Sequence, residues 1–335
     1  MKQRGLDTKL QRIRAGEYRS TDFLLADAKD GEMGGGVHAA GPQYDPDSGD
    51  QIGFKPYLAY QQAMRDMTGT GLVDIMLMAA SSAERLHDEK LFDGSPVTPA
   101  VRLNDATDIW GFRGASYKAH PSRPFRTANL QKVRRIADLG LYSVTFYNDL
   151  AIDVPALEAY GEFRAEAAAA DMRHFLEVFA PAFDIDTGEA RLADYMNDSI
   201  VRCLAGVLSD EMPLFLKMPF LGAQAMEELS AYDPGRIVVG ILGGSGGTTR
   251  DAFELISQGE RHGARVALFG RKINLAEDPV TLVGMMRRVI ERDLDPREAV
   301  RAYHGELSKK GLRPIRQVDD DNIVTESVLK AEAQS

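Results

Sequence analysis

The sequence contains little cysteine, little histidine and no long apolar run. Cys203 is the single cysteine among 335 residues, which excludes an internal disulfide framework and favours the reducing cytoplasm. No apolar run is long enough to span a lipid bilayer, so we expect no membrane association. The basic N-terminal segment lacks the apolar core of a secretory signal. The net charge of −10 argues against a nucleic-acid-binding surface.

The rest of the composition is that of a large globular chain. Hydrophobic residues make up 44% of the sequence, enough for one extended core, and no Pro/Ser-rich linker divides it. Short apolar runs alternate with amphipathic stretches, as in proteins with buried parallel strands and covering helices. The apolar runs predict eight strands, at residues 23–26, 73–78, 97–103, 142–147, 173–179, 214–218, 237–242 and 265–269. The main predicted helices lie at residues 57–68, 82–91, 130–139, 155–171, 192–208, 223–231, 279–293 and 296–308.

This alternation predicts an α/β fold, a single-domain (β/α)8 TIM barrel, rather than a doubly wound sheet. Residues 31–56 and 105–129 are predicted to be long loops after strands 1 and 3, a kind of segment that often forms lids or substrate loops. We expect an N-terminal extension at residues 1–20, the catalytic barrel at 21–312 with extra C-terminal helices, and a polar tail at 313–335.

Two glycine-terminated strands near the C-terminal end predict a phosphate site. The strand at 237–242 stops at the run GGSGG, and the strand at 265–269 stops at Gly270 and Arg271; a predicted helix follows each. Backbone N–H groups converge at such junctions and bind anions. Because many (β/α)8 barrels hold one phosphate between the loops after strands seven and eight, this pattern also favours the barrel.

Four ionisable residues lie in or just after predicted buried strands, where apolar residues are expected. They are Lys217, Glu177, Asp27 and Lys29. In a barrel, functional side chains lie at the carboxyl ends of the strands and converge on the axis. We therefore treat these four residues as candidate catalytic groups, although a salt-bridged lysine and a turn-capping aspartate are the structural alternatives.

Lys217 has the surroundings of a Schiff-base lysine. Its neighbours Leu216 and Met218 are apolar, and burial among such groups disfavours the charged ammonium form. A neutral amine attacks a carbonyl carbon, and the resulting iminium accepts electrons from a neighbouring C–C bond. Glu177 on the preceding strand is the predicted proton carrier.

The motifs also resemble a known family when they are taken in order. DAKDG follows strand one, FLEVF forms strand five, FLKMPF forms strand six, and LFGRKI forms strand eight after a Gly/Ser loop. This order is similar to that of the class I aldolases of the tagatose-bisphosphate aldolase group. Archaeal-type fructose-bisphosphate aldolases and the sulfofructose-phosphate aldolase look like more distant relatives. The resemblance covers most of the chain and implies a cytoplasmic lyase of carbohydrate metabolism, a homodimer or larger homo-oligomer that needs no metal and no organic cofactor.

The resemblance implies a role for each matching residue. Lys217 matches the Schiff-base lysine, Glu177 the general acid/base, and Asp27 the aspartate that contacts substrate hydroxyls, while Lys29 stands where the group usually has arginine. The implied phosphate-binding residues are Gly243, Gly244, Ser245, Gly270 and Arg271.

One departure concerns strand four. The sugar-bisphosphate enzymes carry a lysine there, whereas this chain has Ser143, Val144 and Thr145. The identity of the sugar phosphate and a second substrate phosphate therefore stay open. The basic residues Arg113, Lys118, His120, Arg123 and Arg126 form a candidate site for a second anionic group.

The favoured hypothesis is a class I aldolase that cleaves or forms a C–C bond in a phosphorylated ketose. A transaldolase uses the same iminium and is not separated from it. A metal-assisted barrel lyase is the second alternative, with Asp27, Asp30 and Glu32 as oxygen ligands, although the six histidines show no paired ligand spacing. The third alternative is a non-catalytic barrel that binds sugar phosphates.

Overall fold

Alternating apolar strands and covering helices close into a barrel in the computed structural model, which describes residues 5–45, 48, 50–105, 107–111, 113–243 and 247–333. The described residues form one eight-stranded parallel sheet and a two-stranded hairpin. In the order of the sheet, the eight strands are β8 (Leu216–Lys217), β7 (Arg173–Phe179), β6 (Leu139–Thr145), β5 (Thr98–Arg102), β4 (Ile75–Met78), β1 (Leu24–Lys29), β10 (Val266–Phe269) and β9 (Gly240–Leu242). A parallel bridge between Met218 and Ile241 joins the two ends of this order. The predicted (β/α)8 TIM barrel is confirmed.

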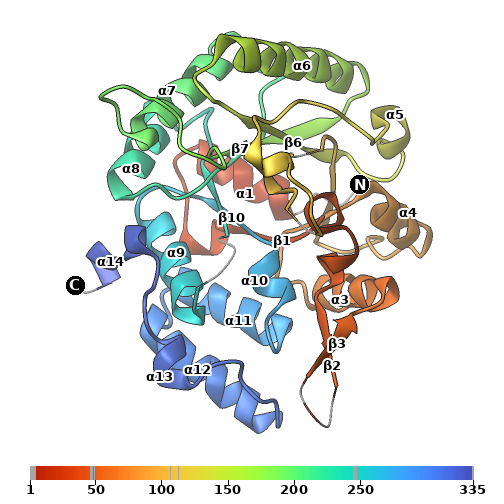
Figure 1. The fold of residues 1–335 in the computed structure, drawn as a ribbon, viewed down its shortest axis with the longest axis vertical. Coiled ribbons are helices and arrows are strands. Elements are labelled where there is room, and N and C mark those ends of the chain that lie inside the picture. Colours follow the sequence, from red (N-terminus) through yellow and green to blue (C-terminus); the bar gives the residue numbers. More distant parts are fainter. Residues whose placement is uncertain are drawn as a thin grey trace.

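Helices cover the outside of the strand ring (Figure 1). They are α3 (Tyr57–Thr70), α4 (Ala80–Asp88), α5 (Leu130–Val133), α6 (Leu150–Ala169), α7 (Leu192–Leu204), α8 (Ala223–Tyr232), α9 (Thr249–Arg261), α10 (Arg271–Asn274), α11 (Pro279–Ile290) and α12 (Pro296–Lys309). Two short helices, α13 (Val318–Asp321) and α14 (Ser327–Ala333), follow α12. Among the described residues, none of the helices is both long and apolar enough to cross a membrane.

Alternation along the strands divides the core into two layers, because successive side chains point to opposite faces. Inward residues such as Ala26, Leu141 and Phe215 form one cluster inside the ring. Outward residues such as Leu25 and Leu216 pack with the helices in a second, larger cluster. This alternation decides which polar side chains near the strand ends point into the barrel.

Helix α1 (Gly5–Arg14) closes one end of the ring (Figure 1, red). Its residues Leu6, Leu10 and Ile13 are buried in the same cluster as the inward strand residues. Arg14 donates to the carbonyl oxygen of Leu214, just before β8. The segment expected to be an N-terminal extension therefore contributes to the core of the barrel.

Several predicted boundaries were wrong, and two of them bear on the site. The strand predicted at 23–26 continues to Lys29, because its parallel pairing with β4 runs as far as Lys29, opposite Met78. The helix predicted at 130–139 ends at Val133, since Leu139 and Leu141 belong to the inward layer of β6. Within β6, position 140 has room only for glycine, because a Cβ atom there would lie 2.0 Å from the Leu103 side chain.

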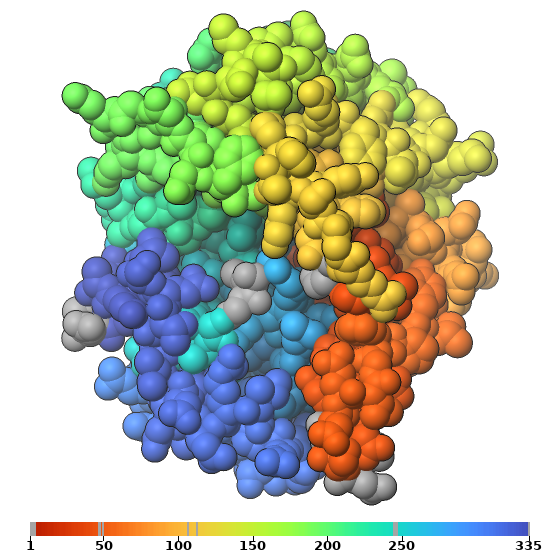
Figure 2. Space-filling model, in the orientation of Figure 1, coloured from red at the N-terminus to blue at the C-terminus, as the bar shows by residue number. Residues whose placement is uncertain are grey.

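The long segment after β1 is not irregular. It forms α2 (Glu32–Gly35), a 3-10 helix (Gly36–Ala40), and the antiparallel hairpin of β2 (Pro42–Tyr44) and β3 (Gln51–Phe54). Residues 105–129 contain two further 3-10 helices, Thr107–Ile109 and Tyr117–Ala119. Figure 2 shows a hollow in the face of the molecule between the orange, yellow and blue segments, which contain these two loops and the C-terminal helices.

We expect Leu10→Ala to lower the free energy of unfolding by about 2–4 kcal/mol, because it removes a buried side chain from the floor of the barrel. Gln11→Ala, at the adjacent exposed position, is the matched control. Urea denaturation followed by circular dichroism measures both. Equal stability of the two variants would show that α1 does not support the core.

Candidate functional site

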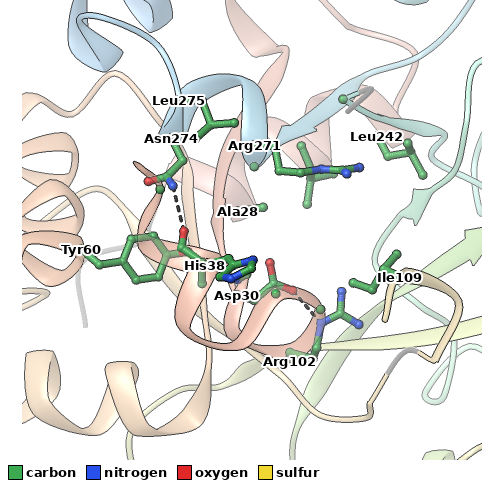
Figure 3. Close-up of a pocket in the computed structure, with 18 of the residues that line it drawn as sticks. Ala28, Asp30, His38, Tyr60, Arg102, Ile109, Leu242, Arg271, Asn274 and Leu275 are labelled. Carbon is green, nitrogen blue, oxygen red and sulfur yellow. Dashed lines mark hydrogen bonds and ion pairs between the residues drawn. The ribbon is translucent and has the colours of Figure 1, made fainter. Parts of the chain in front are cut away.

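A cavity of about 320 Å³ opens at the carboxyl ends of the strands. Its wall combines strand-end residues with the segment from Gly31 to Phe54. Figure 3 shows Arg271 and Leu242 on one side of this cavity, and His38, Asp30 and Arg102 on the other. The charged residues that line it are Asp30, Arg102, Glu177, Lys217 and Arg271.

Lys217 and Glu177 meet inside this cavity. They are paired in register on β8 and β7, and Lys217 Nζ lies 2.5 Å from Glu177 Oε1. Both side chains are almost completely buried, at 8% and 1% exposure. Each is inward because it lies two positions after an inward phenylalanine, Phe215 or Phe175. The structure therefore brings together the two residues predicted to react.

Arg102 at the end of β5 is a site residue that the sequence interpretation missed. Its Nη2 donates to Glu177 Oε2 at 2.9 Å, its Nε to Asp30 Oδ2 at 2.6 Å, and its Nη1 to Ser143 Oγ at 2.7 Å. Ser143 Oγ in turn donates to Glu177 Oε2 at 2.7 Å. The rule that selected Lys217, a charge near the end of a buried strand, also applies to Arg102.

The two cations control the charge of Glu177. Burial alone would raise the pKa of this carboxyl group, but Lys217 and Arg102 outweigh burial and lower its pKa to about 2. For Arg102, burial opposes the charged form, but Asp30 and Glu177 raise its pKa above the usual value. Glu177 is therefore a carboxylate in the resting site.

Asp27 and Lys29 do not line the cavity. Their side chains are 0% and 1% exposed and form an ion pair of 3.0 Å with each other. Ala26 and Ala28 are the inward residues of β1, so Asp27 and Lys29 face the helices. Burial raises the pKa of Asp27, although Lys29 opposes this shift. Asp30, directly after the strand, is the acidic residue of this segment that reaches the cavity.

The predicted phosphate residues lie in part on the opposite wall. Gly243, Gly270 and Arg271 line the cavity, whereas Gly244 and Ser245 lie outside the described residues. A Cβ atom on Gly243 would lie 2.3 Å from the Phe269 ring, and one on Gly270 would lie 2.8 Å from the Ala28 carbonyl oxygen. Glycine is therefore needed at both positions for the strand ends to approach each other.

Side chains of this chain already bind several N–H groups at the N-terminus of α9. Thr248 N and Thr325 N donate to the Asp251 carboxylate, and Thr249 N donates to Asp321 Oδ1 at 2.8 Å. Thr248 Oγ1 also donates to the Ile323 carbonyl oxygen at 2.6 Å. Two carboxylates thus cap this helix, so a bound phosphate would depend on the loop before it and on Arg271.

The two long loops meet above the cavity. Arg113 Nε donates to His38 Nε2 at 2.8 Å, and the His38 ring stacks on Phe54 with centroids 4.1 Å apart. Arg126 lies elsewhere, since it pairs with Glu166 on α6 at 2.7 Å. Arg113 and Arg126 of the predicted basic group therefore contact different parts of the molecule.

The three acidic residues of the metal-assisted alternative each bind a different partner. Asp27 pairs with Lys29, Asp30 pairs with Arg102, and Glu32 Oε1 accepts from Ser82 Oγ at 3.0 Å. Across the described part of the chain, no group of three or more His, Cys, Asp or Glu residues is placed to hold a metal ion. The structure thus gives this alternative no ligand set there.

Sequence comparison does not place the chain, since no protein-family model and no curated protein matches it. Solved structures do match its fold. A fructose-bisphosphate aldolase from Slackia heliotrinireducens has a TM-score of 0.62 at 14% identity, with 90% of each chain covered. An archaeal fructose 1,6-bisphosphate aldolase has a TM-score of 0.57 at 15% identity, with 85% of this chain and 99% of that chain covered.

A third structure, Cgl0159 from Corynebacterium glutamicum, has a TM-score of 0.55 at 20% identity, with 86% of this chain and 98% of that chain covered. The likeness to archaeal-type aldolases expected from the motifs is confirmed for the fold. At such identities it establishes the barrel, while the chemistry has to be argued from the site.

We expect Arg271→Met to weaken the binding of inorganic phosphate about tenfold or more, because a charge-assisted contact is lost. Stability should change little, since no hydrogen bond or ion pair joins the Arg271 side chain to another described residue. Isothermal titration measures the affinity, with Arg288→Met on the exposed surface as a control of equal charge. Unchanged phosphate affinity in Arg271→Met would remove Arg271 from the phosphate site.

Proposed function

We propose that the protein is a class I aldolase, a lyase that cleaves or forms a C–C bond in a phosphorylated ketose through a Schiff base on Lys217. The observation that carries this proposal is the buried contact of 2.5 Å between Lys217 and Glu177 in a cavity that Arg271 also lines. The fold supports it, since similar solved structures include archaeal aldolases, one with its catalytic lysine bound to the carbinolamine intermediate of its substrate.

The contact between Lys217 and Glu177 supports imine chemistry. Glu177 takes a proton from Lys217 Nζ, and the neutral amine attacks the ketone carbon to form a carbinolamine. The carbinolamine hydroxyl leaves as water after it gains a proton, and an iminium remains. When the neighbouring C–C bond breaks, its electron pair moves into the iminium to give an enamine, which a proton later converts to the product ketone imine.

The anchoring groups fix the substrate against Lys217. Arg271, Gly243 and Gly270 line the wall that would hold the phosphoryl group, and we include Gly244 and Ser245 in this site from the motif. Asp30, which lines the opposite side, replaces Asp27 as the acidic residue proposed to contact substrate hydroxyls. A cytoplasmic location, a homo-oligomeric state and a role in carbohydrate metabolism remain predictions that accompany this function.

The proposal predicts a covalent adduct. Borohydride added with dihydroxyacetone phosphate or a ketose phosphate should trap one substrate fragment, and peptide mass mapping should locate it on Lys217 and not on Lys29. Lys217→Met should form no adduct and lose activity by several orders of magnitude, because no other group replaces the nucleophile.

Lys132→Met, which changes an exposed lysine, is the matched control and should behave like the wild type. A folded wild-type protein that traps nothing across a panel of triose and ketose phosphates would contradict the proposed function.

Activity should be unchanged after dialysis against EDTA, because the Lys217 iminium itself accepts the electrons of the broken bond. Initial rates with and without added Mg²⁺ measure this. A loss of activity that Mg²⁺ restores would favour the metal-assisted alternative.

A further inference from the structure

Arg102 connects the two acidic side chains of the cavity. It is 2% exposed, and its guanidinium contacts Asp30 after β1, Ser143 on β6 and Glu177 on β7. A planar guanidinium presents its N–H groups in fixed directions. The two carboxylates it binds are therefore held in fixed places on the cavity floor.

We propose that Arg102 is a positioning residue that divides the proton transfers of the reaction, so that Glu177 acts at Lys217 while Asp30 acts at the substrate hydroxyl. This inference rests on the function proposed above and assigns a separate step to each carboxylate.

The hydrogen bonds of Glu177 direct it to one task. Oε1 lies 2.5 Å from Lys217 Nζ, while Oε2 accepts from both Arg102 Nη2 and Ser143 Oγ. Only Oε1 is therefore directed at the amine. Asn104 secures Ser143 in turn, since it accepts from the Ser143 backbone N–H at 2.7 Å and donates to the Ser143 carbonyl oxygen at 2.8 Å.

The charges favour the same division. When Lys217 becomes a neutral amine, Arg102 keeps its positive charge, because guanidinium does not lose its proton in proteins. Once Glu177 has taken the Lys217 proton, it is a neutral acid hydrogen-bonded to this fixed cation, which favours its return to the carboxylate. Such an acid gives its proton readily to the carbinolamine hydroxyl, which leaves as water as the C=N bond forms.

Bond cleavage then needs a base at the substrate hydroxyl. Both oxygens of Glu177 are engaged, so Asp30 is the other acidic residue lining the cavity that can serve. Its side chain is 10% exposed and lines the cavity, with Oδ2 on Arg102 Nε. Asp30 takes the proton of the substrate hydroxyl, that C–O becomes a carbonyl, and the electrons of the broken C–C bond enter the iminium. The other titratable or charged groups lining the cavity are His38, Tyr60, Lys217 and Arg271.

The two roles predict opposite effects of two isosteric variants. Asp30→Asn should form the borohydride-trapped adduct on Lys217 at close to the wild-type rate but cleave substrate at least about a hundredfold more slowly. Glu177→Gln should form the adduct itself more slowly by a similar factor. Asp30→Asn that cleaves substrate at the wild-type rate, or that fails to form the adduct, would overturn the division of roles.

Arg102 is tested by a readout that does not depend on catalysis. Carbon-13 NMR of the glutamate carboxyl groups, with Glu177 assigned by Glu177→Gln, should show Glu177 ionised from pH 8 down to pH 4 in the wild type. Loss of the cation in Arg102→Met raises the Glu177 pKa, so its titration should move upward by roughly two pH units or more. The acid limb of kcat/KM should move in the same direction.

Arg102→Lys keeps the positive charge, so the Glu177 pKa should return most of the way to its wild-type value. This variant keeps the test decisive if Arg102→Met does not fold. Ser143→Ala removes a neutral donor to the same oxygen and should give a smaller shift. A Glu177 titration in folded Arg102→Met equal to that of the wild type would refute the positioning role. A wild-type protein without an adduct would instead refute the proposed function, and the NMR result would still decide the role of Arg102.

Discussion

The site depends on one shared carboxylate. Glu177 offers one oxygen to Lys217 and the other to Arg102, at 2.5 and 2.9 Å. Three charges are thereby buried together, and an unpaired member would be costly in such a place. Arg102 also pairs with a second carboxylate, that of Asp30. The charges on the cavity floor therefore compensate one another. Arg271 lines the opposite wall and takes no part in these ion pairs.

The barrel supplies this arrangement through alternation and register. Residues two apart on a strand share a face, so Glu177 and Lys217 stand one layer above Phe175 and Phe215 inside the ring. Parallel pairing places β7 and β8 side by side with these two residues in register. Helix α1 closes the ring with apolar side chains, which leaves the carboxyl ends of the strands as the open side.

Much of this could be predicted from the sequence. Buried runs and covering helices gave the barrel, and an unexplained charge in a buried strand identified Lys217 and Glu177. The same rule also selected Asp27 and Lys29, which face the helices and pair with each other. Both alternating sets of positions in β1 begin with apolar residues, so its sequence alone does not show which set faces the inside of the barrel. The pairing with the neighbouring strands decides this. The Thr248–Asp251 capping box of α9 is local, but the carboxylate that accepts from Thr249 N belongs to Asp321, which is too distant in sequence for a local motif to reveal.

The proposed site has a reacting half, Lys217 with Glu177, and an anchoring half around Arg271. A crystal structure of the protein reduced with borohydride in the presence of a ketose phosphate tests both halves at once. We predict continuous density from Lys217 Nζ to a substrate carbon, with the phosphoryl group against Arg271 and a hydroxyl beside Asp30. Density on another lysine, or a phosphoryl group bound away from Arg271, would contradict the account.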